Sequence, residues 1–384
     1  MSRPGKKEAK ARTAFVYSDR LAAFDYGESH PMKPERLRLT VELIEAMGLD
    51  RLPSSMFIEA RSATIEELLL FHTPEYLKVL KEADSGIIPA NGAEHGLGFS
   101  DNPVFKGVFE WSALCAGASM QAAELVASGK ADIAFNISGG LHHAMPERAS
   151  GFCYINDAAV AIKYLARLGK RVAYVDIDAH HGDGVEAAFN STDSVLTVSI
   201  HESGEWLFPG TGAAIDIGVG AGTGFAVNVP LPPSAGDDLF LRAFEEVVEP
   251  VVKGFAPDIL VTQLGVDTFE TDPITHLRLT TGGFEKALSR FRKMKLPWVA
   301  LGGGGYDIGN VARAWTLAWG IMNDVTATNS IPEDFIRRKN GIFRNSLLRD
   351  EPIVQEITPD ELREFESVVA YVRKTVLPLM RKGG

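Results

Sequence analysis

The segment AYVDIDAHHGDGVEAAF, residues 173–189, begins as an apolar strand and ends in charge. Three carboxylates and two histidines fall within the eight positions from Asp176 to Asp183. The apolar part is typical of a strand that helices cover on both faces of a parallel sheet. In such sheets ligands bind beyond the carboxyl ends of the strands, so the charge stands where a functional site is expected.

Other short runs rich in Val, Ile and Ala have the same character, and helical patterns separate many of them. The predicted strands are residues 13–18, 132–138, 171–178, 195–201, 258–265 and 297–303. The predicted helices are residues 109–129, 156–169, 237–255 and a closing helix at 358–380. This alternation predicts an α/β fold with three layers, α/β/α, around a central parallel sheet. No linker, low-complexity block or repeat divides the sequence, so a single domain over residues 1–384 is expected.

The composition is that of a globular protein and argues against several classes of function. The 384 residues are 45% hydrophobic, and the formal net charge is −11 at pH 7. This acidic balance disfavours binding to nucleic acid or to anionic membranes. No apolar run has the length of a membrane span or a signal peptide, so no membrane association is expected.

The two cysteines, Cys115 and Cys153, cannot build a disulfide framework and indicate a reducing compartment. A cytoplasmic protein is therefore expected. The basic start of the chain, residues 1–12, is expected to be disordered.

Polar residues follow five of the predicted strands. Because the strands are expected to run parallel, their carboxyl ends should meet at one edge of the sheet. The segments that follow these ends are SGGLHHAM with His142 and His143, DIDAHHGD, SIHESGEWLFPGTG, LGVDTFETDP with Asp267, and LGGGGYD with Tyr306.

A metal ion is the partner that makes the charge at this edge tolerable, because neighbouring buried carboxylates otherwise resist joint ionisation. Asp176, Asp178 and His180 are two residues apart and project to one face of an extended chain. Asp178 and His180, joined by Asp267, give three protein ligands and leave a coordination position for water. This is the pattern of catalytic zinc, although Fe(II) suits the same ligands.

The remaining groups at the edge can serve a metal-dependent hydrolysis. His142 and His143 can act as general base and as proton donor, one in each role. Each histidine needs an orienting carboxylate, and Asp176 and Asp183 are the acids not assigned to the metal. Tyr306, after four glycines, can polarise a carbonyl group. His181 is interpreted as a packing or supporting residue without an assigned role.

Long motifs resemble the zinc-dependent histone deacetylase superfamily. The chain is most similar to class I enzymes and to the bacterial acetoin-utilization (AcuC-type) deacetylases. The similarity runs from residue 30 to residue 315. The motifs are GGLHHAMPERASGFCYINDAAVA, VDIDAHHGDGVEAAF, FPGTG and LGGGGYDIGNVARAW. The resemblance implies a single arginase/deacetylase-type domain that hydrolyses the N-acetyl group of acetyl-lysine and releases acetate.

The resemblance also implies roles for individual residues. Asp178, His180 and Asp267 match the zinc ligands, and His142 and His143 the catalytic histidines, with His143 favoured as the main base and acid. Behind the histidines stand Asp176 and Asp183, while Tyr306 matches the tyrosine that polarises the carbonyl group. The tunnel for the acyl-lysine side chain corresponds to Gly151, Phe152 and Phe208, its mouth to Ile274, its rim to Asp101, and an acetate-release cavity to Arg36.

The family also binds K⁺ or Na⁺ at two sites, largely through backbone oxygens. The inner site corresponds to Asp176, Asp178, His180, Ser199 and Ile200, and the outer site to Phe189, Thr192, Val195 and Phe225. The sequence after Asp267, TFETDPITHL, resembles the bacterial AcuC type more than eukaryotic class I enzymes. An acetylated protein is thus the expected partner, with an acyl-CoA synthetase as the AcuC-type candidate, and the oligomeric state stays open.

Three other functions are rivals to protein deacetylation. An arginase-like enzyme with two manganese ions needs a carboxylate two residues after Asp267, where this chain has Phe269. An acetylpolyamine deacetylase needs an acidic residue at the tunnel mouth, where Ile274 stands, although Asp272 and Glu270 lie nearby in the sequence. A non-catalytic binding module is disfavoured because every catalytic position carries the expected residue type.

Overall fold

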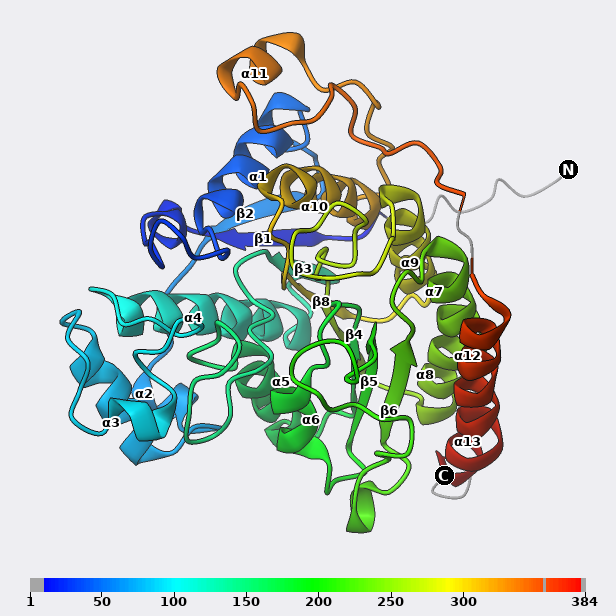
Figure 1. Cartoon of the computed structure of the whole chain (residues 1–384). Coiled ribbons are helices and arrows are strands. Elements are labelled where there is room, and N and C mark those ends of the chain that lie inside the picture. The colour runs from blue at the N-terminus through cyan, green and yellow to red at the C-terminus, as the bar shows by residue number, and fades with distance from the viewer. Residues whose placement is uncertain (1–9, 355–356, 381–384) are drawn as a thin grey trace, which may run out of the picture.

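The central element of the computed structural model is one sheet of eight parallel strands, in the order β2-β1-β3-β8-β7-β4-β5-β6 (Figure 1). The structure describes residues 10–354 and 357–380. The strands are β1 Thr13–Tyr17, β2 Ser55–Glu59, β3 Ile133–Asn136, β4 Val172–Asp176, β5 Val195–Glu202, β6 Ala226–Leu231, β7 Ile259–Gln263 and β8 Trp298–Leu301. The predicted parallel sheet is confirmed.

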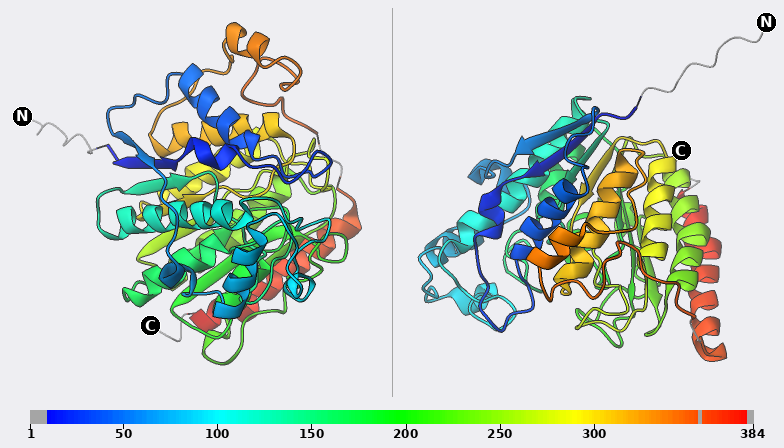
Figure 2. Two further views of the ribbon diagram at one scale, coloured as in Figure 1. Left: turned by 90° about the vertical axis from the view of Figure 1, so that its left-hand side faces the viewer. Right: turned by 90° about the horizontal axis from the view of Figure 1, so that it is seen from above.

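Helices cover both faces of the sheet. On one face α4 packs against β1, β3, β8 and α5, while on the other α1 packs on α10 and α10 on α9 (Figure 2). The α-helices are α1 Glu35–Ala46, α2 Ile65–Leu68, α3 Pro74–Ala83, α4 Val108–Ala127, α5 Asp157–Arg167, α6 Asp183–Phe189, α7 Asp237–Ala243, α8 Glu249–Phe255, α9 Thr281–Lys293, α10 Ile308–Met322, α11 Glu333–Arg338, α12 Pro359–Tyr371 and α13 Leu377–Met380. The predicted three-layer α/β/α arrangement is therefore confirmed.

Short 3₁₀ and π turns complete the architecture. The 3₁₀ turns are η1 Asp19–Ala22, η2 Gly92–His95 and η3 Gly220–Gly222, and the π turns are η4 Phe244–Val248 and η5 Val372–Val376. Each π turn joins two α-helices, so the predicted helix 237–255 consists of α7, η4 and α8. The closing helix likewise consists of α12, η5 and α13, and it starts at a capping box formed by Thr358 and Glu361.

Two strands were not predicted, and both lie at the edges of the sheet. β2 pairs only with β1 and leaves Met56 and Phe57 exposed, so its sequence lacks the continuous apolar run of a central strand. β6 pairs only with β5 and contains Asn228 and Pro230, which interrupt the apolar pattern. Neither sequence therefore shows the continuous apolar run of a central strand, in β2 because the strand is exposed and in β6 because the polar residue Asn228 and Pro230 interrupt it.

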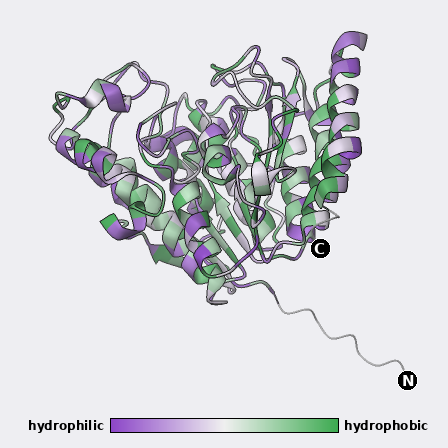
Figure 3. Ribbon diagram, turned by 90° about the horizontal axis from the view of Figure 1, so that it is seen from below, coloured by the Kyte–Doolittle hydropathy of each residue, from purple (hydrophilic) through white to green (hydrophobic). Residues whose placement is uncertain are grey.

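Apolar side chains pack together in the space between the layers. The central strands are coloured mostly as hydrophobic in Figure 3. Trp298, Trp315 and Trp319 are among the largest fully buried side chains. At the start of the described chain, the Arg12 guanidinium pairs with Asp132 at 2.8 Å. Most of the segment expected to be disordered, residues 1–9, lies outside the described residues. Within the described ranges, no helix combines the length and apolar character needed to cross a membrane.

The parallel sheet determines where the polar segments meet. β3, β8, β7, β4 and β5 are consecutive neighbours in the sheet, and each is followed by one of the five predicted polar segments. Their carboxyl ends therefore lie side by side at one edge, as expected for a ligand site in an α/β sheet.

Candidate active site

Three predicted metal ligands converge beyond the ends of β4 and β7. Asp178, His180 and Asp267 are buried, and their ligand atoms lie within 4.8 Å of one another. His180 Nδ1 lies 3.1 Å from Asp178 Oδ1 and 2.9 Å from Asp267 Oδ2. One nitrogen and two carboxylate oxygens thus face a common point. This donor set suits a divalent cation with a position left for water or substrate.

The outer oxygens of the two carboxylates are held by the surrounding chain. Asp178 Oδ2 accepts the Gln263 side-chain amide at 2.5 Å and the Gly304 N–H at 2.7 Å, and Asp267 Oδ1 accepts the Ala179 N–H at 2.9 Å. A Cβ on Gly304 would lie 2.1 Å from Asp267 Oδ2, so only glycine allows the backbone to approach this closely. These contacts leave the inner oxygens directed at the common point, which is the fit expected of a metal site.

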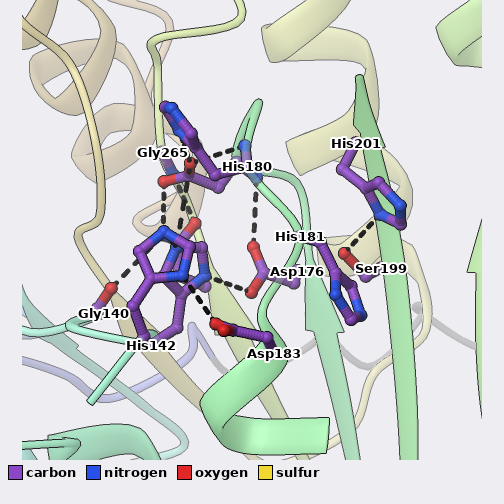
Figure 4. A network of polar contacts seen from close by, with 12 residues as sticks. Gly140, His142, Asp176, His180, His181, Asp183, Ser199, His201 and Gly265 are labelled. Carbon is purple, nitrogen blue, oxygen red and sulfur yellow. Dashed lines mark hydrogen bonds and ion pairs between the residues drawn. The ribbon is translucent and has the colours of Figure 1, made fainter. Parts of the chain in front are cut away.

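Two histidine–carboxylate pairs lie beside the triad (Figure 4). His142 Nδ1–H donates to Asp176 at 2.7 Å, and His143 Nδ1–H donates to Asp183 at 2.7 Å. The two Nε2 atoms are 3.1 Å apart. His142 and His143 follow β3, Asp176 ends β4, and Asp183 begins α6. The sheet thus brings together residues from separate segments in the arrangement expected from the sequence.

The two histidines differ in their electrostatics although both are buried. For His142, burial alone would lower the pKa, but the charges of Asp176 and Asp178 outweigh it and raise the pKa to about 9. For His143, burial and the neighbouring charge of His142 lower the pKa to about 4. At neutral pH these shifts favour a charged His142 and a neutral His143, whose unprotonated Nε2 accepts the hydrogen carried by His142 Nε2.

Aromatic rings stand beside these groups, at the positions predicted to line the approach of the acyl-lysine side chain. The Phe208 ring stands edge-on to His143 with centroids 5.0 Å apart, and the Phe152 ring stands edge-on to Tyr306 at 5.6 Å. A Cβ on Gly151 would lie 2.5 Å from His143 and 2.8 Å from Phe208. Only glycine therefore fits beside these two rings. Burial, followed by the charges of Asp267 and Asp178, raises the Tyr306 pKa well above its usual value, so its hydroxyl keeps its proton.

The other predicted substrate residues lie on loops around this approach. Asp101 is exposed, and its carbonyl oxygen lies 3.3 Å from His30 Nε2, while the His30 ring stands edge-on to Phe152. Ile274 is half-buried, and its N–H donates to Asp272.

Arg36 lies in the interior behind the glycine segment that precedes Tyr306. Its guanidinium donates to the carbonyl groups of Gly303 and Gly305, both at 2.7 Å. Its buried Nε has no hydrogen-bond partner among the described residues. Arg36, the residue predicted to serve acetate release, is thus a buried cation whose Nε–H group is available to a ligand.

The two predicted monovalent-cation sets lie on neighbouring segments. In the inner set, Ser199 of β5 stands directly beside Asp176 of β4 in the sheet register. The outer set surrounds the start of β5: the Thr192 N–H donates to the Phe189 carbonyl, and the Phe225 carbonyl accepts the Thr197 N–H. The remaining members, Ile200 and Val195, belong to β5, while Asp178 and His180 belong to the metal triad.

Sequence reasoning missed several residues that support the site. Gln263 holds Asp178, and the Tyr174 hydroxyl donates to Asp176 at 2.6 Å. The Asn156 side chain donates to the carbonyl groups of His142 and Ala144, both at 3.1 Å. Gln263 and Tyr174 were readable as polar side chains inside otherwise apolar strands, which is a signal of a buried partner. Asn156 was included only as the first residue of the predicted helix 156–169.

Known proteins resemble this chain over most of its length. The histone deacetylase domain family matches residues 30–322. Acetoin utilization protein AcuC of Bacillus subtilis (strain 168) is 40% identical over 332 residues, or 84% of this chain and 85% of that protein. Histone deacetylase RPD3 of Saccharomyces cerevisiae is 40% identical over 334 residues, or 85% of this chain and 75% of that protein.

A solved structure extends the similarity to the fold. The crystal structure of an HDAC homolog from Aquifex aeolicus superimposes with a TM-score of 0.84 and 33% sequence identity, and the match covers 93% of this chain and 100% of that one. The class I-like resemblance and the arginase/deacetylase-type fold inferred from the sequence are thereby confirmed. The chain belongs to the histone deacetylase family.

Proposed function

We propose that this chain is a metal-dependent deacetylase that hydrolyses the amide of Nε-acetyl-lysine and releases acetate. The observation that carries the proposal is the convergence of the Asp178, His180 and Asp267 triad with two histidine–carboxylate pairs behind an approach lined by Phe152 and Phe208. A passage beside these aromatic rings would suit a long aliphatic side chain that ends in an amide. The polar end of the approach supplies the groups that amide hydrolysis needs.

Zinc is the proposed metal, with Fe(II) as the alternative that the same ligands accept. Asp178, His180 and Asp267 would hold it. When bound there, the metal acts as a Lewis acid toward the amide carbonyl and the attacking water. A second metal is disfavoured because Phe269 points into the core, where it is 2% exposed and packs on Phe284. Within the described residues, this triad is the single cluster of three or more ligands close enough to share an ion.

The histidines carry the proton in this proposal. His143 Nε2 exchanges its hydrogen bond from His142 for one from water, and it takes a proton from that water as the water oxygen bonds to the amide carbon. The same proton then passes to the amide nitrogen as the carbon–nitrogen bond breaks, which leaves the lysine amine and acetic acid, and the acid then loses its remaining proton to give acetate. His143 is suited to this role because its low pKa leaves Nε2 unprotonated at neutral pH. The charged His142 stabilises the negative charge that develops beside it.

Tyr306 acts when water attacks the amide, and Arg36 acts on the acetate product. The Tyr306 hydroxyl, which keeps its proton, donates to the carbonyl oxygen as charge develops on it. Arg36, buried behind the glycine segment, offers its unused Nε–H to the acetate product. Ile274 and Asp101 at the mouth and rim would contact the substrate backbone and the stem of the lysine.

Polyamine deacetylation is the second candidate, and the contacts of the nearby acids argue against it. Asp272 is 8% exposed and accepts the N–H groups of Tyr306 and Ile274 at 2.8 and 3.2 Å. Glu270 pairs with Arg278. Because both acids already have partners, neither is placed to hold the distal ammonium of a polyamine.

Several finer assignments belong to the same proposal. We propose an acetylated protein as the substrate, with an acyl-CoA synthetase as one candidate, and the cytoplasm as the compartment. K⁺ or Na⁺ would bind at the inner set near Ser199 and at the outer set around the start of β5. Residues 1–384 would act as a single catalytic domain.

A direct comparison of substrates tests the proposal. Zinc-loaded protein is assayed for kcat/KM on an acetyl-lysine peptide, an N-acetylated polyamine and arginine under one set of conditions. The proposal expects the peptide to be the best substrate. Faster hydrolysis of the polyamine would favour the second candidate, and urea release from arginine would point to the arginase-like rival.

A further inference from the structure

His181 takes no part in the proposed reaction, although it belongs to the motif that builds the site. Its ring is turned away from the metal triad and is 3% exposed (Figure 4). The carboxylate of Glu186 only accepts hydrogen bonds, so His181 Nε2–H donates to it at 3.2 Å. In the neutral ring Nδ1 is then an acceptor, and it receives the Thr211 hydroxyl at 2.8 Å. Both ring nitrogens are therefore engaged.

His201 lies beside His181 and is held in the same way. It is fully buried, and the two ring centroids are 4.8 Å apart. Because the Gly212 carbonyl only accepts, His201 Nε2–H donates to it at 3.0 Å, and Nδ1 accepts the Ser199 hydroxyl at 2.8 Å. These contacts define one tautomer and one ring orientation.

The two histidines thus bind consecutive residues, Thr211 and Gly212, of the loop 203–216. This loop follows β5 and carries Phe208. It packs directly on the rings, because a Cβ on Gly212 would lie 2.4 Å from His201 Nε2 and 2.7 Å from His181 Cγ. Gly212 also has a φ of +86°, which favours glycine. The loop therefore has little freedom to shift relative to the histidines.

The loop has a third attachment further along, at Asp216, and Asn228 of β6 provides it. Its side-chain amide donates to the Asp216 carbonyl at 3.1 Å and to Glu186, the partner of His181, at 2.7 Å. The attachments at Thr211, Gly212 and Asp216 all lie on the side of the loop that follows Phe208.

We infer that His181 and His201 are positioning residues that clamp this loop and thereby set the distance between Phe208 and His143. The inference rests on the proposed function, in which Phe208 forms one wall of the passage for the acyl-lysine side chain. Buried histidines need partners for both nitrogens, and a fully satisfied polar network specifies a single arrangement more strictly than apolar packing does. The width of the passage, and with it the selection of acyl groups, would follow from this clamp.

Thr211 offers a matched pair of variants because its side chain lies on an exposed residue of the loop. Thr211→Val removes the hydroxyl and keeps the shape, whereas Thr211→Ser keeps the hydroxyl. Two quantities are measured in each variant: hydrogen exchange of the amides of residues 203–216, and kcat and KM for acetyl-lysine and butyryl-lysine peptides. Gly212→Ala is a second variant, in which the added Cβ pushes the loop off both rings.

The expected result is about fivefold faster loop exchange in Thr211→Val, the size of one neutral hydrogen bond, with Thr211→Ser restoring the wild-type rate. KM for the acetyl peptide should rise by about the same factor with kcat changed less, and the preference for acetyl over butyryl should narrow. Gly212→Ala should shift the same quantities further.

Unchanged exchange and an unchanged acyl preference in both Thr211→Val and Gly212→Ala would overturn the inference. An equal fall in kcat for both peptides without faster exchange would also overturn it. Exchange is measured without substrate, so it tests the clamp even if wild-type protein hydrolyses neither peptide. A wild-type protein that hydrolyses neither peptide would count against the proposed function alone.

Discussion

His142 and His143 face each other through their Nε2 atoms, 3.1 Å apart, while their Nδ1 atoms donate to different carboxylates, Asp176 and Asp183. One hydrogen fits between the two Nε2 atoms. Because the pKa of His142 is raised to about 9 and that of His143 is lowered to about 4, this hydrogen belongs to His142. Two adjacent histidines of the same motif are thus divided into a fixed charge and a proton acceptor.

His143→Ala should lower kcat on an acetyl-lysine peptide by about 10²- to 10⁴-fold, the usual contribution of a general base. The metal ligands remain, so metal content measured by mass spectrometry should equal that of the wild type. A variant that keeps its metal and turns over at a near-normal rate would contradict the role given to His143.

Tyr306→Phe removes one hydroxyl and keeps the ring that stands against Phe152. Loss of a donor to the developing oxyanion should reduce kcat by about 10²- to 10³-fold, with a smaller effect on KM. Steady-state kinetics on the peptide check this. A rise in KM with unchanged kcat would instead assign Tyr306 to substrate binding.

Gln263→Leu should weaken metal binding by about 10- to 100-fold, because the amide that holds Asp178 at 2.5 Å is lost. Competition with a chelator of known affinity measures the change. Thr262→Val is the matched control: Thr262 is the preceding residue of β7, and its hydroxyl accepts the indole N–H of Trp298 instead of contacting the triad. Equal metal affinities in the two variants would show that the Gln263 contact has no part in holding the metal.

Stability should fall with acidification because of His72. Burial lowers the His72 pKa to about 4, and its Nε2 accepts the Asn156 N–H at 3.0 Å, which requires the neutral ring. Between pH 6.5 and pH 4 His72 is protonated in the unfolded chain but stays neutral in the folded chain. The free energy of unfolding therefore drops as the pH falls from 6.5 toward 4. The loss between pH 7 and pH 5 should be about 2 kcal/mol.

Urea unfolding of the wild type and of His72→Gln at the two pH values isolates this contribution. The wild type should lose about 2 kcal/mol more than the variant, which has no titrating ring at this position. Identical pH dependence in the two proteins would mean that His72 does not resist protonation in the folded state.

The central strands and the clustering of the candidate site residues were predictable because burial and chemistry both leave marks in the sequence. The apolar run before Asp176 predicts a covered strand, and the spacing of Asp178 and His180 predicts a shared ligand. The edge strands β2 and β6 leave weaker marks, because β2 is largely exposed and β6, although buried, contains Asn228 and Pro230. The place of Asp267 beside β4 follows from a strand order that local patterns do not encode.

Supporting contacts were harder to foresee because they depend on side-chain direction. The sequence places His181 next to His180, yet the two rings serve different parts of the molecule: one faces the metal triad, and the other holds Thr211. Gln263 lies on a different strand from Asp178, so the contact between them needs the sheet order β7-β4. Sequence spacing therefore identified the residues that cluster at the candidate site but not the residues that hold them in place.

The claim that one metal ion at the triad supports deacetylation is tested most directly by titrating zinc into protein from which a chelator has removed the metal. Acetate release from an acetyl-lysine peptide is followed as zinc is added in substoichiometric steps. We expect no measurable turnover in the metal-free protein, a linear rise up to one equivalent of zinc, and a plateau beyond it. Turnover that is independent of metal, or a rise that continues to two equivalents, would contradict a deacetylase built on the single triad of Asp178, His180 and Asp267.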